Sequence, residues 1–163
     1  MPALALAATF AAVLVSGGVF GFFYAWSFTV MRGLGRTDPV GAIEAMQAIN
    51  ASIMTGWFAL IFFGTPVITA AGAGLAWLAG ERPAALWLVA AALAYLVGCF
   101  AVTVVVNVPM NDALAGLDAR AEADPAAAWA AYAGRWTAWN HVRTAACGVT
   151  LLAAALALWS WRD

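Results

Sequence analysis

Residues 136–161, WTAWNHVRTAACGVTLLAAALALWSW, place polar and aromatic side chains directly before a long apolar run. Arg143 is the last charged residue of this stretch, and 18 uncharged residues follow it (144–161). About 20 apolar residues suffice for a helix to cross the hydrocarbon core of a membrane. The stretch therefore predicts a membrane-spanning helix with polar groups at its edge, where such groups are usually paired or functional.

Three more uncharged runs occur earlier in the chain, at residues 1–31, 45–80 and 83–111. Of the 163 residues, 66 % are hydrophobic and 9 % are charged. Soluble domains carry about 25 % charged residues, so this composition indicates a membrane protein. We predict an all-α integral membrane four-helix bundle that forms a single domain over residues 1–163. The expected spans are about 3–30, 51–79, 84–106 and 144–161.

Composition also limits the partners and cofactors. The chain has no lysine and a net charge of −1, so nothing favours nucleic acid. Cys99 and Cys147 lie in apolar runs, and no CxxC or paired-histidine spacing indicates a metal site. His141 is the single histidine, so a haem would find one imidazole ligand at most. No cofactor is evident; the expected partners are the lipid bilayer and a small aromatic or hydrophobic ligand, and homo-oligomerisation stays open.

The second and fourth helices are predicted to project from the membrane on one side. Asp38-Pro39 has the residue types of a helix N-cap and first position, and a helical pattern continues to about Ala79. These roughly 40 residues would extend about 60 Å, twice the hydrocarbon thickness. The helix therefore projects or breaks, with Thr55-Gly56 as the expected break. Asp124-Pro125 repeats the start signal before the fourth helix.

Glycine and proline predict the close contacts and turns. Gly17 and Gly21 form a GxxxG pair, which lets a neighbouring helix approach closely. Residues 80–83 (Gly-Glu-Arg-Pro) are typical of a tight turn between the second and third spans. Pro109 predicts a kink or a restart of the third helix, because it removes a backbone donor. Residues 113–123 are predicted as a short polar helix.

Four spans put the first and third loops on the same side of the membrane, which gathers polar side chains from three helices. On the fourth helix, one polar stripe contains Trp136, Asn140, Arg143 and Cys147. On the third helix, a second stripe contains Thr103, Asn107 and Asn111. Glu44, Gln47 and Asn50 add an arc of about 120° on the projecting part of the second helix. Most of the arginines lie on this side, so the positive-inside rule places both loops in the cytoplasm.

Five segments resemble the DUF1772, or anthrone oxygenase-like, family of small membrane proteins. They are Tyr24…Met31, Met46-Gln47-Ala48-Ile49-Asn50, Gly56-Trp57-Phe58, Asn107-Val108-Pro109-Met110-Asn111-Asp112 and Trp136…Trp139-Asn140-His141-Val142-Arg143. The similarity runs over nearly the whole chain, although many relatives have Met-Pro where this chain has Met31-Arg32. The resemblance implies oxidation of an anthrone to an anthraquinone, as in fungal members linked to polyketide pathways. Most bacterial members, which this chain resembles, have no assigned activity; we expect the bacterial inner membrane.

Oxidation of an anthrone needs a base, donors for the enolate oxygen and a flat apolar slot, after which O₂ attacks the electron-rich enolate without a metal. Glu44 and His141 are the candidate bases. The candidate donors to the oxyanion are Arg143, Asn107, Asn111 and Asn140. The candidate substrate-binding residues are Gln47, Asn50, Tyr24, Trp57, Trp136 and Trp139.

A non-enzymatic alternative explains the same residues. Arg143 then pairs with Glu44 and with asparagine side chains and locks three helices together, because a buried charge needs pairing whether or not a ligand binds. In this alternative the protein is a small-molecule or lipid binder or carrier, or a structural bundle. His141 and Arg143 lie about 200° apart around a helix and cannot share one pocket. The stripe assigns Arg143 to the pocket and leaves Glu44 ahead of His141 as the base.

Overall fold

The computed structural model describes residues 1–53 and 56–161, and within these ranges it contains helices and turns but no strand. Four of the described helices are long and apolar enough to cross a membrane. They are Pro2–Leu34, Trp57–Leu78, Arg82–Ala115 and Pro125–Trp159. The predicted all-α membrane bundle is therefore confirmed.

The first long helix runs through α1 (Pro2–Ala25), the π-helical turn η1 (Trp26–Val30) and α2 (Met31–Leu34). Its glycines pack less closely than the GxxxG pattern predicted. A Cβ on Gly17 would meet only the side chain of Leu151, at 3.9 Å, and one on Gly21 would meet nothing within 4 Å. The predicted close approach at Gly21 is wrong, because this residue lies on an exposed face of the helix.

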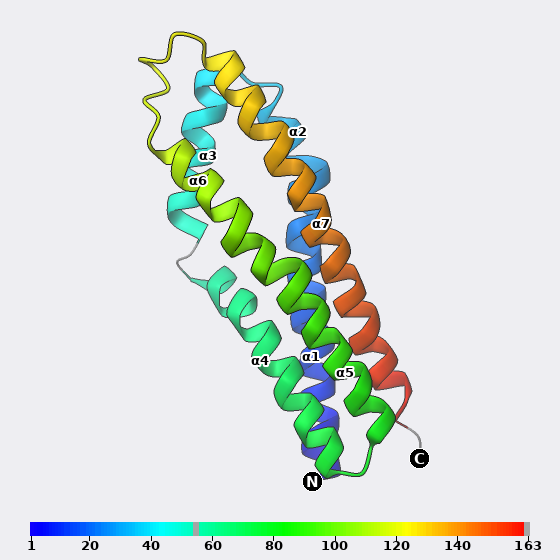
Figure 1. Ribbon diagram of the computed structural model, residues 1–163. Helices are drawn as coiled ribbons and strands as arrows, with labels where there is room; N and C mark the ends of the chain where they lie inside the picture. Colours follow the sequence, from blue (N-terminus) through cyan, green and yellow to red (C-terminus); the bar gives the residue numbers. More distant parts are fainter. Residues whose placement is uncertain (54–55, 162–163) are drawn as a thin grey trace.

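The second helix is broken, as its length requires. Asp38 caps α3 (Pro39–Ile53), where its Oδ1 accepts a hydrogen bond from the Gly41 N–H at 2.8 Å. The chain starts again as α4 (Trp57–Leu78) after Gly56, whose φ of 89° lies in the left-handed region that favours glycine. The predicted break at Gly56 is confirmed, whereas Thr55 lies outside the described residues. In Figure 1, α3 stands above α4 and away from its axis.

The third helix continues past its proline. It runs through α5 (Arg82–Tyr95), the π-helical segments η2 (Leu96–Ala101) and η3 (Thr103–Asn107), and α6 (Val108–Ala115). Pro109 follows directly after the π-helical segment η3 and has no backbone N–H to donate to the turn before it. The helix therefore changes its winding at this point and does not end.

The predicted short helix over residues 113–123 is wrong. The helix ends at Ala115, and residues 116–124 form turns. The Gln47 side chain explains part of this ending, because its Nε2 donates to the carbonyl oxygens of Leu114 (2.8 Å) and Leu117 (2.9 Å). Two hydrogen bonds from α3 thus take up acceptors that a longer helix would use.

The fourth helix, α7 (Pro125–Trp159), is a single uninterrupted element. The predicted cap at Asp124 is confirmed, since its Oδ1 accepts a hydrogen bond from the Ala127 N–H at 2.9 Å. The helix is 35 residues long, or about 52 Å at 1.5 Å per residue, and so is longer than a bilayer core is thick. Its length connects the membrane bundle to the parts that project from it.

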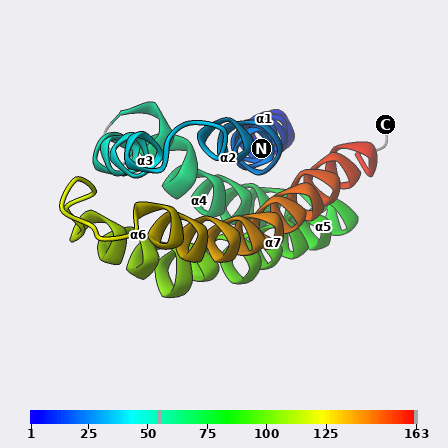
Figure 2. The same cartoon turned by 90° about the horizontal axis from the view of Figure 1, so that it is seen from above.

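The four long helices pack in the cyclic order α1, α4, α5 and α7. Figure 2 shows α1, α2 and α3 on one side of the molecule and α5, α6 and α7 on the other, with α4 between them. The start of α1, the end of α7 and the turn between α4 and α5 lie at one end (Figure 1). At the other end, α2, α3, α6 and the first half of α7 form what we call the head. A buried cluster that includes Met31, Ile43, Met46 and Trp129 holds the head together.

One close helix contact lies between η2 and α7. A Cβ on Gly98 would sit 2.4 Å from the Cβ of Ala146, so only glycine fits. We expect Gly98→Ala to destabilise the protein by about 1–3 kcal/mol, the usual cost of overpacking a core. Gly74→Ala is the matched control, since its new Cβ meets nothing within 4 Å. Unfolding in mixed micelles measures both variants, and equal stabilities would contradict the contact.

Arg82 and Ala121 are expected on opposite sides of the membrane. Both residues are exposed: Arg82 is the first residue of α5, and Ala121 lies in the turns between α6 and α7. The start of α5 and the connection between α6 and α7 lie at opposite ends of the bundle (Figure 1). In a background with the buried Cys99 and Cys147 replaced by alanine, Arg82→Cys should react with an impermeant maleimide added outside intact cells. Ala121→Cys should react only after the membrane is opened, because the arginine-rich head is predicted to be cytoplasmic. Labelling of both cysteines from the same side would contradict the four-span topology.

Candidate functional site

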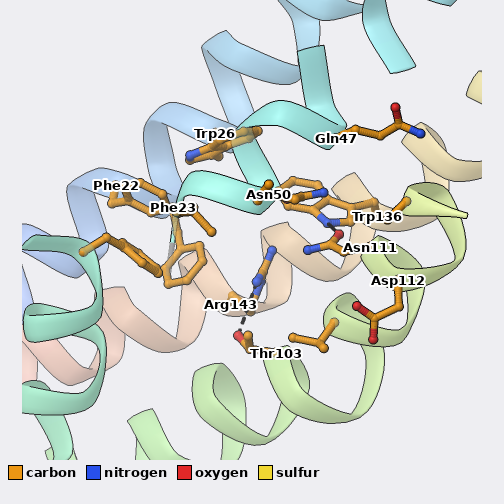
Figure 3. A pocket seen from close by; sticks show the side chains of 15 residues that line it. Phe22, Phe23, Trp26, Gln47, Asn50, Thr103, Asn111, Asp112, Trp136 and Arg143 are labelled. Atoms are coloured by element: carbon orange, nitrogen blue, oxygen red, sulfur yellow. Dashed lines mark hydrogen bonds between the residues drawn. The ribbon is translucent and has the colours of Figure 1, made fainter. Parts of the chain in front are cut away.

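A cavity of about 260 Å³ lies where the head meets the membrane bundle (Figure 3). Elements from all parts of the chain line it, including α1, α3, α4, η3, α6 and α7. Its aromatic side chains are Phe22, Phe23, Trp26, Phe58 and Trp136. Its polar side chains are Gln47, Asn50, Thr103, Asn111, Asp112 and Arg143. The walls are thus mostly apolar, with a few polar groups that converge on one space.

Arg143 is the buried charge of this cavity. It is 4 % exposed, and its Nη2 donates to Asn140 Oδ1 at 2.8 Å while its Nη1 donates to Thr103 Oγ1 at 3.2 Å. The guanidinium carbon lies 4.6 Å from the Phe23 ring centre and 5.0 Å from that of Trp136. Within residues 1–53 and 56–161, no carboxylate pairs with it and its Nε has no hydrogen-bond partner. Neutral groups alone therefore hold the charge.

Asn140 fixes the orientation of the Arg143 guanidinium. It is fully buried, and its Nδ2 donates to the Phe23 carbonyl (3.0 Å) and to Ser27 Oγ (2.8 Å). Ser27 Oγ in turn shares a 3.0 Å hydrogen bond with Thr144 Oγ1. Both amide hydrogens of Asn140 are thereby used, which leaves its Oδ1 directed at the guanidinium. Asn140 acts as a positioning residue behind the cavity wall.

In Asn111 the side-chain oxygen is used by hydrogen bonds, whereas in Asn140 the amide hydrogens are. The Asn111 Oδ1 accepts hydrogen bonds from Tyr132 Oη and from Trp136 Nε1, both at 2.9 Å. Because the oxygen is used, the amide nitrogen is the group that Asn111 presents to the cavity (Figure 3). On α3, the buried Nδ2 of Asn50 has no partner among the described residues. Asn111, Asn50 and Arg143 therefore contribute N–H donors to the cavity region.

Asn107 is buried beneath the site and does not belong to the described cavity lining. Its Nδ2 donates to the Trp136 carbonyl at 3.4 Å. All three members of the stripe of Thr103, Asn107 and Asn111 make hydrogen bonds to α7, but they differ in position. Thr103 and Asn111 reach the cavity, and Asn107 connects η3 to the backbone of α7.

The structure separates Glu44 from the cavity. The Arg120 Nε and Nη2 donate to its two carboxylate oxygens at 2.7 and 3.1 Å, on the exposed surface of the head. The Glu44 carboxylate raises the pKa of Arg120. The expected pair between Glu44 and Arg143 is therefore wrong, because the rotation of α3 turns Glu44 toward the loop before α7 and turns Gln47 and Asn50 inward.

The four other predicted residues that lie away from the cavity are aromatic or imidazole side chains on the outer surface. His141 is exposed and packs against the Phe28 ring at 5.3 Å, which agrees with its expected separation from Arg143. Tyr24 is 50 % exposed and lies between Phe20 and Phe28. Trp57 and Trp139 are 84 % and 37 % exposed. These positions suit a membrane interface.

Sequence reasoning missed Asp112 and most of the aromatic wall. Asp112 is the first charged residue after the uncharged run 83–111 and directly follows Asn111. This position in the sequence could have identified it as a candidate site residue. Phe22, Phe23 and Phe58 have no such signal in a chain this apolar, although Phe22 and Phe58 pack with ring centres 4.3 Å apart. Among the described residues, no group of three or more His, Cys, Asp or Glu side chains suits a metal ion.

Comparison with known proteins adds one finding. The sequence model of a family described as anthrone oxygenase matches residues 57–158. No curated protein and no solved structure matches the chain. The matched segment contains Thr103, Asn111, Asp112, Trp136 and Arg143, whereas the α1 and α3 walls of the cavity precede it.

The hydrogen bonds of the site predict unequal costs for two substitutions. Asn140→Ala removes three buried hydrogen bonds and leaves Arg143 without its best acceptor, so we expect a loss of about 2–3 kcal/mol in unfolding free energy. Glu44→Gln weakens only an exposed ion pair and should cost about 0–1 kcal/mol. Unfolding in mixed micelles measures both. A Glu44→Gln cost as large as that of Asn140→Ala would show that Glu44 supports a buried charge.

Proposed function

The chain belongs to the anthrone oxygenase family, and on this premise we propose that its cavity binds a flat phenolic ketone of the anthrone type and promotes its oxidation by O₂. In this reaction the substrate loses a proton from its central CH₂ group and becomes an enolate. The enolate transfers electrons to O₂ and forms a hydroperoxide at that carbon. Loss of water from the hydroperoxide gives the quinone, so that one O₂ is consumed and one water is released.

The apolar walls support a flat ring system as ligand. Phe22 and Phe58 form one wall, and Trp26 and Trp136, with ring centres 5.5 Å apart, form another. The volume of about 260 Å³ lies just below the usual range of ligand pockets, roughly 300–1,000 Å³. This size suits a compact aromatic compound better than a long-chain lipid.

The buried, carboxylate-free Arg143 is the observation that carries the proposal. Removal of a charge from water is expensive unless an opposite charge or several hydrogen bonds replace the water. Asn140 and Thr103 supply two neutral acceptors, so the guanidinium keeps most of its capacity for an anionic oxygen. An enolate oxygen carries more charge than the ketone from which it forms. Arg143 therefore stabilises the enolate more than the substrate, which is the condition for catalysis.

A binding or carrier function needs the same contacts without the reaction. The apolar lining and the buried cation favour this second candidate equally, because they select a lipophilic anion whether or not it is oxidised. The consumption of O₂ distinguishes the two candidates.

Arg143 should be needed for both binding and turnover. With the protein in nanodiscs and 1,8-dihydroxyanthrone as probe, we expect tryptophan quenching, O₂ uptake and quinone absorbance. Arg143→Gln should lower turnover by about 10²-fold or more, the scale of an oxyanion donor, and Arg143→Lys should restore only part of it. Arg135→Gln, an exposed arginine on the same helix, is the control and should behave as wild type.

Three outcomes would change these conclusions. Quenching without O₂ uptake by the wild type would favour the carrier. Full turnover by Arg143→Gln would remove the oxyanion site from the mechanism. An equal loss in Arg135→Gln would point to the stability of α7 as the cause.

A further inference from the structure

The cavity contains a carboxylate as well as a cation. Asp112 on α6 lines the same space as Arg143, and Figure 3 shows the two side chains on different sides of it. In residues 1–53 and 56–161, Asp112 forms no ion pair within 4.0 Å, either with Arg143 or with another cation. Two opposite charges thus face one small apolar space without contact between them.

Fixed neighbours account for this separation. Asn140 and Thr103 hold the guanidinium, and the rings of Phe23 and Trp136 flank it. Asp112 directly follows Asn111, and Tyr132 and Trp136 hold the Asn111 side chain by two hydrogen bonds. These contacts fix the guanidinium and place Asn111, the neighbour of Asp112, beside the cavity. A ligand that fills the cavity has both residues in its wall, because both line it.

We propose that Asp112 is the base that removes the CH₂ proton of the substrate, while Arg143 receives the enolate oxygen. This inference rests on the proposed function. The Asp112 carboxylate takes the proton and becomes a carboxylic acid, and the electron pair of the broken C–H bond moves into the ring system onto the oxygen at Arg143. After O₂ has added at the same carbon, the acid returns its proton to the peroxide, so the side chain ends the cycle ionised.

The other candidate bases lack this position. The two oxygens of Glu44 are engaged by Arg120, and the His141 ring packs on Phe28 outside the bundle. Asp112 differs from both because it borders the cavity and has no competing cation among the described residues. An aspartate is sufficient as a base for enolisation when donors stabilise the oxyanion at the same time.

Exchange of the substrate CH₂ protons with D₂O tests the inference apart from the oxidation. The probe, 1,8-dihydroxyanthrone, is incubated without O₂ with protein in nanodiscs, and deuterium uptake is followed by NMR. The wild type should accelerate exchange, and Asp112→Asn should lose about 10²-fold or more of that acceleration, the usual scale of general-base catalysis. Probe affinity from tryptophan quenching should change less than threefold. Asp112→Glu should retain part of the exchange rate, and Asp118→Asn, an exposed loop carboxylate, should retain all of it.

Each result decides a different claim. Wild-type exchange by Asp112→Asn, with oxidation intact, would overturn the inference and leave the proposed function. Exchange that depends on Asp112 but no O₂ uptake by the wild type would overturn the proposed function and leave the base. If the wild type does not accelerate exchange, both are wrong. Loss of probe binding together with exchange in Asp112→Asn and Asp112→Glu would make Asp112 a binding group only and overturn its assignment as base.

Discussion

The need to hold one buried positive charge without a counter-ion determines the arrangement of the site. Arg143 lies at the edge of 18 uncharged residues, and no carboxylate within the described residues forms an ion pair with it. Asn140, Thr103 and two aromatic rings take the place of such a carboxylate. Thr103 comes from η3 and Phe23 from α1, while Asn140 and Trp136 lie on α7 with Arg143 itself. The charge is therefore held where α1, η3 and α7 meet.

The π-helical segments belong to the same arrangement. η1 begins three residues after Phe23, whose carbonyl accepts from Asn140, and it contains Ser27, the second acceptor of Asn140. On the third helix, η3 contains both Thr103 and Asn107. A π-helical turn widens the backbone and shifts the angular positions of the residues after it, and such turns are frequent at functional sites. Here they bring polar groups from two neighbouring helices onto the stripe of α7.

The residues show how far sequence reasoning reaches in this fold. An uncharged run or an Asp-Pro start depends on the residues of one helix alone. The four apolar helices and the caps at Asp38 and Asp124 can therefore be predicted from the sequence. The stripe of Trp136, Asn140 and Arg143 likewise follows from the period of α7. The rotation of α3 relative to α7 does not, because it depends on the break at Gly56 and on contacts between helices. The sequence therefore pairs Glu44 with Arg143, whereas in the structure Glu44 binds Arg120. The sequence also does not single out Asp112, which lines the cavity.

The two charged residues of the cavity, Arg143 and Asp112, differ in burial, so its two ends are not equivalent. Arg143 is almost fully buried and Asp112 is exposed, and both line the same cavity with its aromatic walls. An anionic oxygen is bound most strongly at the buried end, because a low dielectric strengthens its attraction to the guanidinium. The carboxylate of Asp112 lies at the exposed end, away from the buried guanidinium. In the proposed reaction, a flat substrate would bind with its oxygen inward at Arg143 and its acidic carbon toward Asp112, and the reverse distribution of charges would not give this orientation.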